Sequence, residues 1–452
     1  MMEKRSKFSS KIGFVLAASG SAVGLGNLWR FPYLAAQYGG GTFLLIYLLL
    51  ALTFGFTMLI TEIAIGRKTR LSAIGAFRSL DKKFAWLGWL ESLVPAIITP
   101  YYCVIGGWVL RYLFVFMRGQ ASAAAEDGYF GSFISSSAAP VIWLTVFILL
   151  VALVVILGVE KGIEKVSVVL MPMLVILSII IAIYVITRPG AVDGIIYYLK
   201  PELSKIRPKT VLAALGQLFY SLSLAMGIMV TYGSYMKSED SLELSVHQID
   251  FFDTLIAFIA GMMIVPAVYM FSNGDESAMS AGPGLMFITL PKIFESMAGG
   301  TVIGVIFFLL VLFAALTSAI SLMETIVSIV QDRLKWQRTK STIVVTLFCL
   351  IMAIPSSLGF GAWSSFTILG MDILDFWDFL SNSVLMPIVA ISICIMIGYV
   401  VGTKAVKEEV ERKGERFKGY GFYCVMVRYI APVAIIAILI TSILSAMGLW
   451  SW

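Results

Sequence analysis

The sequence predicts an all-α integral membrane protein that crosses the bilayer about eleven times. The chain has 452 residues, of which 59% are hydrophobic and only 13% are charged. Soluble domains carry about twice that charged fraction, so the composition excludes a soluble cytosolic or secreted enzyme. Apolar runs long enough to span a bilayer, about 20 residues each, recur along the chain, for example at 139–158, 254–272 and 298–323. We therefore expect a single membrane domain over 1–452.

Hydropathy and charge together give the expected spans and their orientation. The spans are expected at 11–38, 41–67, 87–117, 139–158, 163–187, 209–236, 248–272, 298–331, 341–357, 370–401 and 424–449. Basic residues gather before the first span and after the second, fourth, eighth and tenth. The positive-inside rule then predicts a cytoplasmic N-terminus and an extracytoplasmic C-terminus. The connection 188–209 is also basic although it is expected outside.

Residues suited to soluble or catalytic chemistry are sparse. The net charge of +6 comes from the clusters beside the spans, and it does not indicate nucleic-acid binding. Four cysteines lie in or beside apolar segments without metal-ligand spacing, and we expect them to be small core residues. A single histidine, His247, supports neither a zinc centre nor a Ser-His-Asp triad. The sequence therefore predicts that the protein is not an enzyme.

The first span contains an interruption of its helical pattern. Gly20, Gly24 and Gly26 lie within seven residues, and each costs about 1 kcal/mol of helix stability relative to alanine. Unwound backbone within a membrane is tolerated only where it lines a cavity or meets other protein. The alternative is a small-residue surface for helix packing, which the pair Gly20 and Gly24 also fits.

The sixth span carries a second interruption, at the corresponding place in the next set of five spans. Its stretch 217–227, QLFYSLSLAMG, puts hydroxyls and small residues near the middle of the membrane. Paired interrupted spans point to an inverted-repeat transporter with its site at the bilayer midplane. Free amides at such breaks attract an anionic group and free carbonyls bind cations, which suits a zwitterion with sodium. We expect five-helix repeats over 11–187 and 209–401, with an additional helix at 424–449.

The residues around the first interruption carry a family signature. The run 22–32, AVGLGNLWRFP, followed by glycines at 39–41, resembles the neurotransmitter:sodium symporter family, sodium-coupled amino-acid and amine transporters with the LeuT-type fold. The resemblance covers nearly the whole chain, and eleven spans rather than twelve resemble a bacterial branch. It implies a 5+5 inverted repeat with discontinuous first and sixth helices, embedded in the lipid of the cell inner (plasma) membrane.

The resemblance implies two sodium sites. The first would use Ala22, Asn27, Ser221 and Asp253 together with the substrate carboxylate. The second would use Gly20, Val23, Ala314, Thr317 and Ser318. Taken alone, adjacent hydroxyls in a helix more commonly bond back to their own helix. Ligands that are all oxygen suit a hard cation rather than a transition metal.

Asp253 departs from the asparagine that many relatives have at this position. An intramembrane carboxylate is costly unless it is paired or functional. We hypothesise that it supplies the negative charge that chloride provides in other members, which would make transport chloride-independent and could couple it to proton countertransport. The competing interpretation is an aspartate at a helix end near the cytoplasmic interface.

The resemblance also implies a substrate site with three parts. The carboxylate would meet the amides of Leu25 and Gly26 and the Tyr102 hydroxyl, and the ammonium would meet the carbonyls of Ala22, Tyr220 and Ser221 with the Ser223 hydroxyl. The side chain would face Ile98, Ile105, Tyr220, Met226, Ser318 and Leu322. Any one of these apolar residues could instead be plain core. Because Gly20 stands where amine transporters have an acidic residue, a hydrophobic amino acid is favoured over an amine.

Gates and an unwinding motif are implied in the same way. The outer gate would pair Arg30 with Asp375, and the inner gate would pair Arg5 with Asp332 near Tyr235. Gly162 and Pro172 match a fifth-span motif associated with local unwinding. Proline frees a carbonyl one turn earlier, so unwinding there would open a water path to the second sodium site.

The predicted function is sodium-coupled symport of hydrophobic L-amino acids into the cell by alternating access. A substrate carboxylate that completes one sodium site would make ion and substrate stabilise each other's binding. The expected partners are a small amino acid, sodium ions and membrane lipid, with no nucleic acid. The alternatives are a transport-inactive amino-acid sensor on the same fold and a sodium-coupled carrier of another small carboxylate or amine.

Overall fold

The computed structural model describes residues 6–272, 283–447 and 449. Its first half contains α1 (Lys11–Ala22), α2 (Phe31–Gln37), α3 (Gly41–Leu50), α4 (Phe56–Thr69), α5 (Ala73–Leu80), α6 (Ala85–Met117), α7 (Ala121–Ala125), α8 (Tyr129–Ser135), α9 (Ala139–Ile156), α10 (Lys165–Ile186) and α11 (Ala191–Leu199). Its second half contains α12 (Pro208–Ser221), α13 (Ile228–Tyr235), α14 (Leu242–Phe271), α15 (Leu290–Ser296), α16 (Gly300–Leu334), α17 (Arg338–Leu358), α18 (Ile373–Asp378), α19 (Met386–Ile395), α20 (Lys404–Val410), α21 (Tyr420–Val425) and α22 (Ala431–Ala446).

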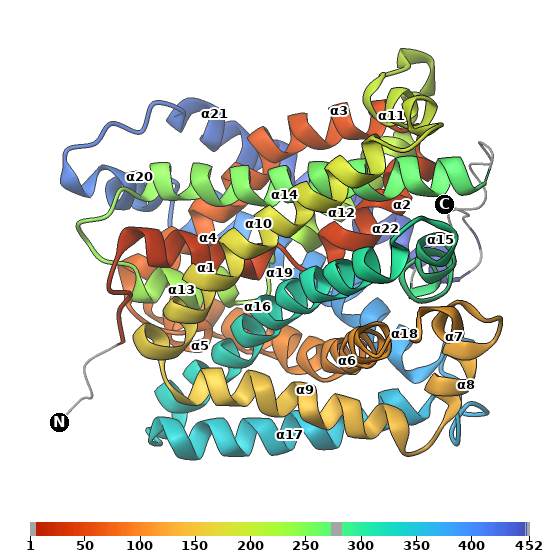
Figure 1. Ribbon diagram of the computed structural model, residues 1–452. Helices are drawn as coiled ribbons and strands as arrows, with labels where there is room; N and C mark the ends of the chain where they lie inside the picture. The colour runs from red at the N-terminus through yellow and green to blue at the C-terminus, as the bar shows by residue number, and fades with distance from the viewer. Residues whose placement is uncertain (1–5, 273–282, 448, 450–452) are drawn as a thin grey trace.

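The long helices form one bundle whose short helices cap its two ends. Figure 1 shows α5 and α20 at the end where the chain begins, and α7, α8, α11 and α15 at the opposite end. Helices that follow one another along the chain therefore cross the bundle in alternate directions, as the alternating charge of the connections predicts.

The predicted spans coincide with helices of the bundle. Among the described residues, nine helices are long and apolar enough to cross a membrane. A tenth candidate is the pair Lys11–Ala22 and Gly26–Gln37, which is bent by 53° at a short break. The remaining expected span, 209–236, is divided between α12 and α13. Several spans also contain wide π-helical turns, at Gly26–Arg30, Ala51–Gly55, Val159–Glu164, Phe379–Leu385, Met396–Val400 and Met426–Ile430.

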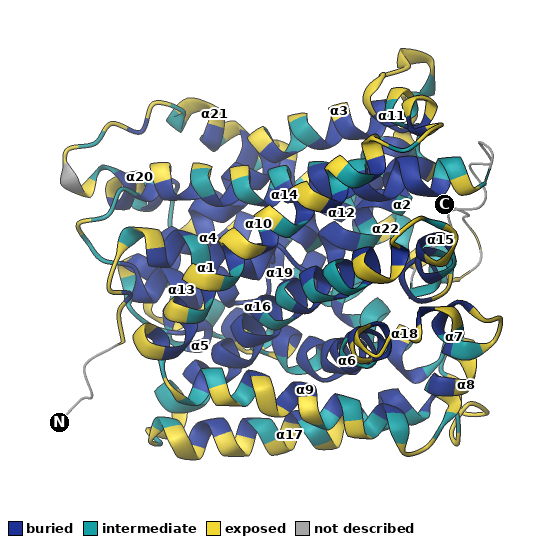
Figure 2. Ribbon diagram, in the orientation of Figure 1, coloured by how far each residue is buried: buried dark blue, intermediate teal, exposed yellow. Residues whose placement is uncertain are grey.

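Burial separates an inner core from an apolar outer belt (Figure 2). The helices α1, α4, α13 and α16 are buried along most of their length, whereas α9, α10, α17 and α22 expose one face. Those exposed faces carry large apolar side chains such as Leu153, Ile180, Ile351 and Val433. Lipid rather than water suits such a surface, and the chain is accordingly a multi-pass membrane protein.

The first helix break depends on two glycines. The helix α1 ends at Ala22, and Val23 is extended with φ −74° and ψ 94°. A Cβ atom on Gly24 would lie 2.7 Å from the Ser318 hydroxyl, and one on Gly26 would lie 2.8 Å from ring carbons of Tyr220. Only glycine lets the main chain approach α12 and α16 this closely.

The second break depends on a left-handed main chain. Residues 222–227 are not helical, and Ser223, Ala225 and Gly227 have φ of 53°, 58° and 71°. A left-handed conformation costs a residue other than glycine about 1–2 kcal/mol. Ser223 and Ala225 therefore keep this conformation because contacts from neighbouring helices hold it.

Buried polar contacts close the end of the bundle where the chain begins. Arg67, whose side chain is 2% exposed, donates from Nε to Glu409 at 2.7 Å. Arg67 also donates to the carbonyl of Asp240 at 2.8 Å. Phe8 is buried, and its amide donates to the Tyr235 carbonyl at 3.3 Å. These contacts tie α4, α13 and α20 and the segment before α1 into one closed layer.

Candidate functional site

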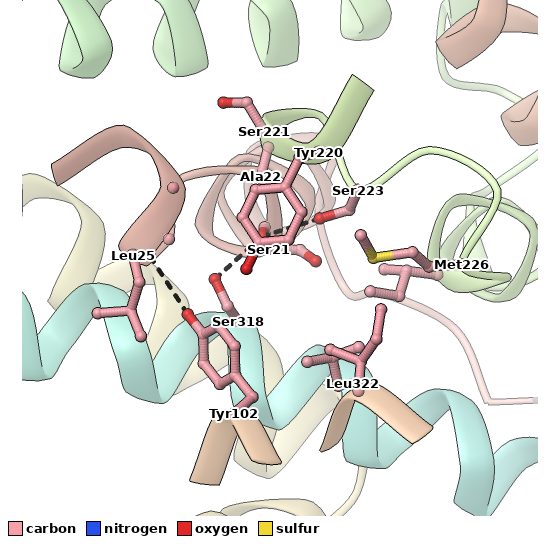
Figure 3. Close-up of a pocket in the computed structure, with 14 residues that line it drawn as sticks. Ser21, Ala22, Leu25, Tyr102, Tyr220, Ser221, Ser223, Met226, Ser318 and Leu322 are labelled. Carbon is pink, nitrogen blue, oxygen red and sulfur yellow. Dashed lines mark hydrogen bonds between the residues drawn. The ribbon is translucent and has the colours of Figure 1, made fainter. Parts of the chain in front are cut away.

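A small, tightly closed cavity of about 30 Å³ lies between the two helix breaks (Figure 3). The lining comes from the first break, α6, the second break and α16, and consists of Ser21, Ala22, Gly24, Leu25, Gly26, Ile98, Tyr102, Tyr220, Ser221, Ser223, Met226, Ile228, Ser318 and Leu322. The structure thus brings together all the substrate residues expected from the sequence except Ile105, which is buried elsewhere in α6.

One wall of the cavity presents hydrogen-bond donors. The amide of Leu25 donates to the hydroxyl of Tyr102 at 3.3 Å, across the gap between the first break and α6. Both residues are buried, so their polar groups need hydrogen-bond partners within the site rather than from bulk water. An amide and a hydroxyl that lie this close together suit a carboxylate, which accepts from both.

The opposite wall presents main-chain carbonyls and hydroxyls. The Ser223 hydroxyl donates to the Ser21 carbonyl at 3.1 Å and so joins the two breaks. Met226 and Leu322 project into the same space from the second break and from α16 (Figure 3). The cavity is therefore polar at its sides and apolar at its end, which is the arrangement that an amino acid with an apolar side chain requires.

Oxygen atoms gather where α1 meets α16, at the place expected for the second sodium site. The Ser318 hydroxyl lies 3.4, 3.0 and 3.4 Å from the carbonyl oxygens of Gly20, Ser21 and Val23. A hydroxyl has one proton and can satisfy one of these three acceptors. The Thr317 hydroxyl bonds back to Phe313 and Ala314, at 3.0 and 3.1 Å. This excess of acceptors over donors fits a hard cation.

Asp253 is the centre of the residues expected for the first sodium site. It is fully buried in α14, so it is not a helix-end residue at the interface. Its Oδ1 accepts from the Asn27 amide and the Ser221 hydroxyl, both at 2.8 Å, and its Oδ2 accepts from the Tyr47 hydroxyl at 3.1 Å. These three donors offset much of the cost of burying the carboxylate. With the carbonyl of Ala22 on the adjoining cavity wall, the set is oxygen-rich and fits a monovalent cation.

Tyr47 belongs to this network and Gln217 contacts the first break, although neither was predicted as a site residue. Gln217 donates to the carbonyl of Gly26 at 2.9 Å and braces the first break from α12. Tyr47 lies 206 residues from Asp253 in the chain. A buried tyrosine hydroxyl needs a hydrogen-bond partner, and its place in the apolar run 41–67 was the available signal.

On the outer side of the cavity, Arg30 and Asp375 of the expected outer gate lie among aromatic and acidic side chains. The guanidinium of Arg30 lies 5.3 Å from the centre of the Tyr220 ring, and it interacts electrostatically with Asp378. Asp378 accepts from the Tyr101 hydroxyl at 3.1 Å and from Asn382 at 2.6 Å. Asp375 lies in the first turn of α18, where its amide donates to Asp372.

The contacts of the inner side involve several helices. Arg5 lies outside the described residues. Asp332 accepts from the amide of Ser72 at 2.8 Å. The Tyr235 hydroxyl donates to Glu324 at 2.8 Å, and Arg338 of α17 forms an ion pair with the same carboxylate. Tyr235 is therefore held by Glu324 and Arg338, and its part in an inner gate stays a prediction.

The Gly162 and Pro172 motif lies at the start of the fifth span. Gly162 belongs to the π-helical turn Val159–Glu164, and Pro172 lies within the continuous helix α10. A Cβ atom on Gly162 would lie 2.2 Å from the carbonyl oxygen of Val154. The glycine is thus required for a close approach of α9, and the segment is helical in this structure.

Comparisons with known proteins agree with this architecture. The model of the sodium:neurotransmitter symporter family matches residues 5–125 and 131–449. An uncharacterized sodium-dependent transporter of Bacillus subtilis, YhdH, is 35% identical over 98% of both chains. Another, from Haemophilus influenzae, is 34% identical over 98% of this chain and 99% of its own length.

A solved structure gives the same result for the fold. The crystal structure of MhsT in complex with L-phenylalanine has a TM-score of 0.87 and 36% sequence identity, and the match covers 97% of this chain and all of that one. The fold is therefore of the LeuT type, with discontinuous first and sixth spans. From the signature around the first break, the matching family model and these relatives, we conclude that the chain belongs to the sodium:neurotransmitter symporter family, whose members are secondary transporters rather than enzymes.

Proposed function

We propose that this protein couples the entry of sodium to the uptake of hydrophobic L-amino acids by alternating access, without a need for chloride. The observation that carries the proposal is the division of the cavity into donors, acceptors and an apolar end. Donors at Leu25 and Tyr102 suit the substrate carboxylate, and carbonyls on the facing wall suit its ammonium. The bound L-phenylalanine of MhsT, a protein with the same fold, supports a substrate of this size and kind.

The apolar end sets the preference for the side chain. It is lined by Ile98, Met226, Ile228 and Leu322. None of the described residues that line the cavity is charged. Burial of a hydrophobic side chain there contributes about 25 cal/mol per Å² of apolar surface. Methionine adapts its shape to different partners, so Met226 supports binding of both aliphatic and aromatic amino acids.

Two sodium ions are proposed, one at each set of oxygen ligands. Asn27, Ser221 and Asp253 with the Ala22 carbonyl would hold the first, and Ser318 and Thr317 with the carbonyls of Gly20, Val23 and Ala314 would hold the second. A bound cation supplies charge that attracts the substrate carboxylate. Each charge that moves inward gains about 2.3 kcal/mol per 100 mV of membrane potential.

The fixed charge of Asp253 is the reason to propose chloride independence. An anion that balances the sodium charge must be buried beside the ions, and Asp253 is buried there with three hydrogen-bond donors around it. The proposed orientation, with the N-terminus in the cytoplasm, follows from the basic connections. The end of the bundle that carries Arg67 and Phe8 would then face the cytoplasm.

The proposal is tested with purified protein in proteoliposomes. An inward sodium gradient is expected to drive accumulation of radiolabelled L-phenylalanine or L-leucine, with gluconate as the anion, and a potassium gradient is not. Accumulation that requires chloride would contradict chloride independence. Sodium-dependent binding without accumulation or counterflow would favour the alternative of a transport-inactive sensor, and selective uptake of amines would favour the other carrier.

A further inference from the structure

Two glutamates from different helices contact the main chain of the second helix break. Glu62 of α4 and Glu91 of α6 are both fully buried. Glu62 accepts from the amide of Ala225 at 2.8 Å. Glu91 interacts electrostatically with Glu62 and faces the amide of Gly227. A Cβ atom added to Gly227 would lie 3.7 Å from the Glu91 Cγ. The two carboxyl groups therefore contact the main chain on both sides of Met226, which lines the cavity.

Most of the oxygen atoms of this pair have no partner. Glu62 Oε2 and both carboxyl oxygens of Glu91 make no hydrogen bond. Neither residue has an ion pair within the described chain. The other titratable groups on this side are a thiol and a phenol: the Cys394 thiol of α19 lies towards Glu62, and the Tyr423 hydroxyl beyond it hydrogen-bonds Thr61 at 2.9 Å.

A shared proton accounts for this arrangement. Two ionised carboxylates that lie close together in an apolar interior, without a cation, repel each other and lose their hydration. When one of them is protonated, its O–H can donate to an oxygen of the other, and this supplies one missing partner on each glutamate. We propose that Glu62 and Glu91 form a proton-binding site that holds one proton between them and thereby fixes the stretch 223–227 against the substrate cavity.

The ligand is a proton rather than a sodium ion because of what else faces the pair. A sodium ion needs several oxygen ligands, as other hard cations do. Here the main-chain groups that face the carboxyls are the amides of Ala225 and Gly227, which are donors and would repel a cation. The described residues also contain no group of three or more acidic, histidine or cysteine side chains placed to hold a metal.

The proton would affect the cavity through the main chain of the break. Ser223 and Ala225 adopt left-handed conformations that neighbouring contacts must hold, and the Glu62 bond to Ala225 is one such contact. Loss of the proton would leave two repelling charges beside this stretch and would release Met226 from its position in the cavity wall. Proton and substrate would therefore bind cooperatively, and by linkage each would tighten the binding of the other.

Infrared difference spectroscopy on the full-length protein in detergent tests the proton directly. A protonated carboxyl has a C=O band that shifts in D2O, and E91Q is expected to remove one such band from the wild-type spectrum. The glutamine amide can take the place of the protonated acid and donate to Glu62, so E91Q is expected to fold. The exposed Glu126 gives the matched control E126Q, which should leave the band unchanged.

A binding titration tests the coupling, and this arm alone rests on the proposed function. The apparent affinity of the wild type for L-phenylalanine at saturating sodium is expected to fall as pH rises, by at most about tenfold per pH unit for one linked proton. E91Q is expected to keep the low-pH affinity at all pH values. E126Q should follow the wild-type profile.

The outcomes separate the two proposals. An unchanged band in both E91Q and E62Q, or a band that sodium chloride abolishes in the wild type, would overturn the proton site. A wild-type pH profile in E91Q would overturn the coupling to the cavity. If L-phenylalanine does not bind at all, the proposed substrate fails while the infrared result still decides the proton site. If E91Q does not fold, E62Q and the wild-type spectrum serve in its place.

Discussion

The two proposed sodium sites lie on opposite sides of the same helix break, and their chemistry differs. The site around Asp253 contains a full negative charge, and three side-chain donors already orient its carboxylate. The site around Ser318 contains only neutral oxygens, and three carbonyls converge on a single hydroxyl. The first site is therefore organised by the protein itself, whereas the second lacks donors and would be completed by its ion.

This difference bears on the order in which ions would be held and released. A preformed charged site binds a cation with little reorganisation, because its ligands are already fixed. A neutral site that joins two helices, α1 and α16, binds its ion only while those helices stay together. We expect sodium to leave the Ser318 site first when the inner side opens, and the following variants test the contrast between the sites.

The largest effect is expected for D253N. The neutral amide removes the only full charge among the proposed ligands, and hydrogen bonds to a charged group contribute about 1.5–3 kcal/mol each. We expect the sodium concentration for half-maximal uptake to rise by more than about tenfold in gluconate, with partial recovery when chloride is added. The exposed Asp193 provides the control D193N. A sodium dependence equal to that of the wild type in gluconate would contradict the role of Asp253.

A smaller effect is expected for S318A. The variant removes the one hydroxyl on which three carbonyls converge, a loss comparable to one net hydrogen bond, about 0.5–1.5 kcal/mol. Apparent sodium affinity should weaken by about three- to tenfold, with no dependence on chloride. Ser178, a buried serine that bonds back to its own helix at 2.8 Å, gives the control S178A. Chloride sensitivity in S318A would show that the two sites are not distinct.

Y47F should change sodium binding less than either of these variants. It removes one of three donors to Asp253 and leaves the charge in place. The lost bond weakens the site with and without sodium, so most of its energy cancels, and sodium titrations followed by thermal unfolding should show about two- to fivefold weaker binding. Tyr112 also has a buried hydroxyl, which donates to the Phe287 carbonyl at 2.8 Å, so Y112F controls for the loss of a phenol. Equal effects of Y47F and Y112F on sodium binding would argue against this network.

The smallest effect is expected for T317S. Serine keeps the hydroxyl of Thr317, so the proposed ligand set is unchanged and sodium affinity should stay within about twofold of the wild type. T317V keeps the shape and loses the hydroxyl, and it should resemble S318A. The same thermal titration measures both variants, and a T317S effect as large as that of T317V would assign the role of Thr317 to packing.

The fold could be predicted from the sequence because its signals are local. Apolar runs of bilayer length predict the spans, and Gly24 and Gly26 predict the break that the structure places against Ser318 and Tyr220. The cavity residues followed from the resemblance, which carries positions over one at a time. Ile105, three residues beyond Tyr102 in α6, is not among the residues that line the cavity, and its role stays a prediction.

Contacts between distant segments could not be predicted in this way. Three contacts join different helices: Tyr47 with Asp253, Glu91 with Glu62, and Glu324 with Arg338. The periodicity of a sequence does not indicate which helices become neighbours. Asp378 lies one turn after Asp375. Which of these two carboxylates lies nearer to Arg30 depends on the orientation of α18 in the bundle, and the sequence alone does not give that orientation.

The buried contact between Arg67 and Glu409 has a consequence for biosynthesis. The two residues are 342 positions apart, so the arginine is made long before its carboxylate partner emerges from the ribosome. Until then the arginine lacks the carboxylate that balances its charge, and burying it without that partner would cost several kcal/mol. We therefore expect a chain that stops before α20 to leave this end of the bundle unsealed.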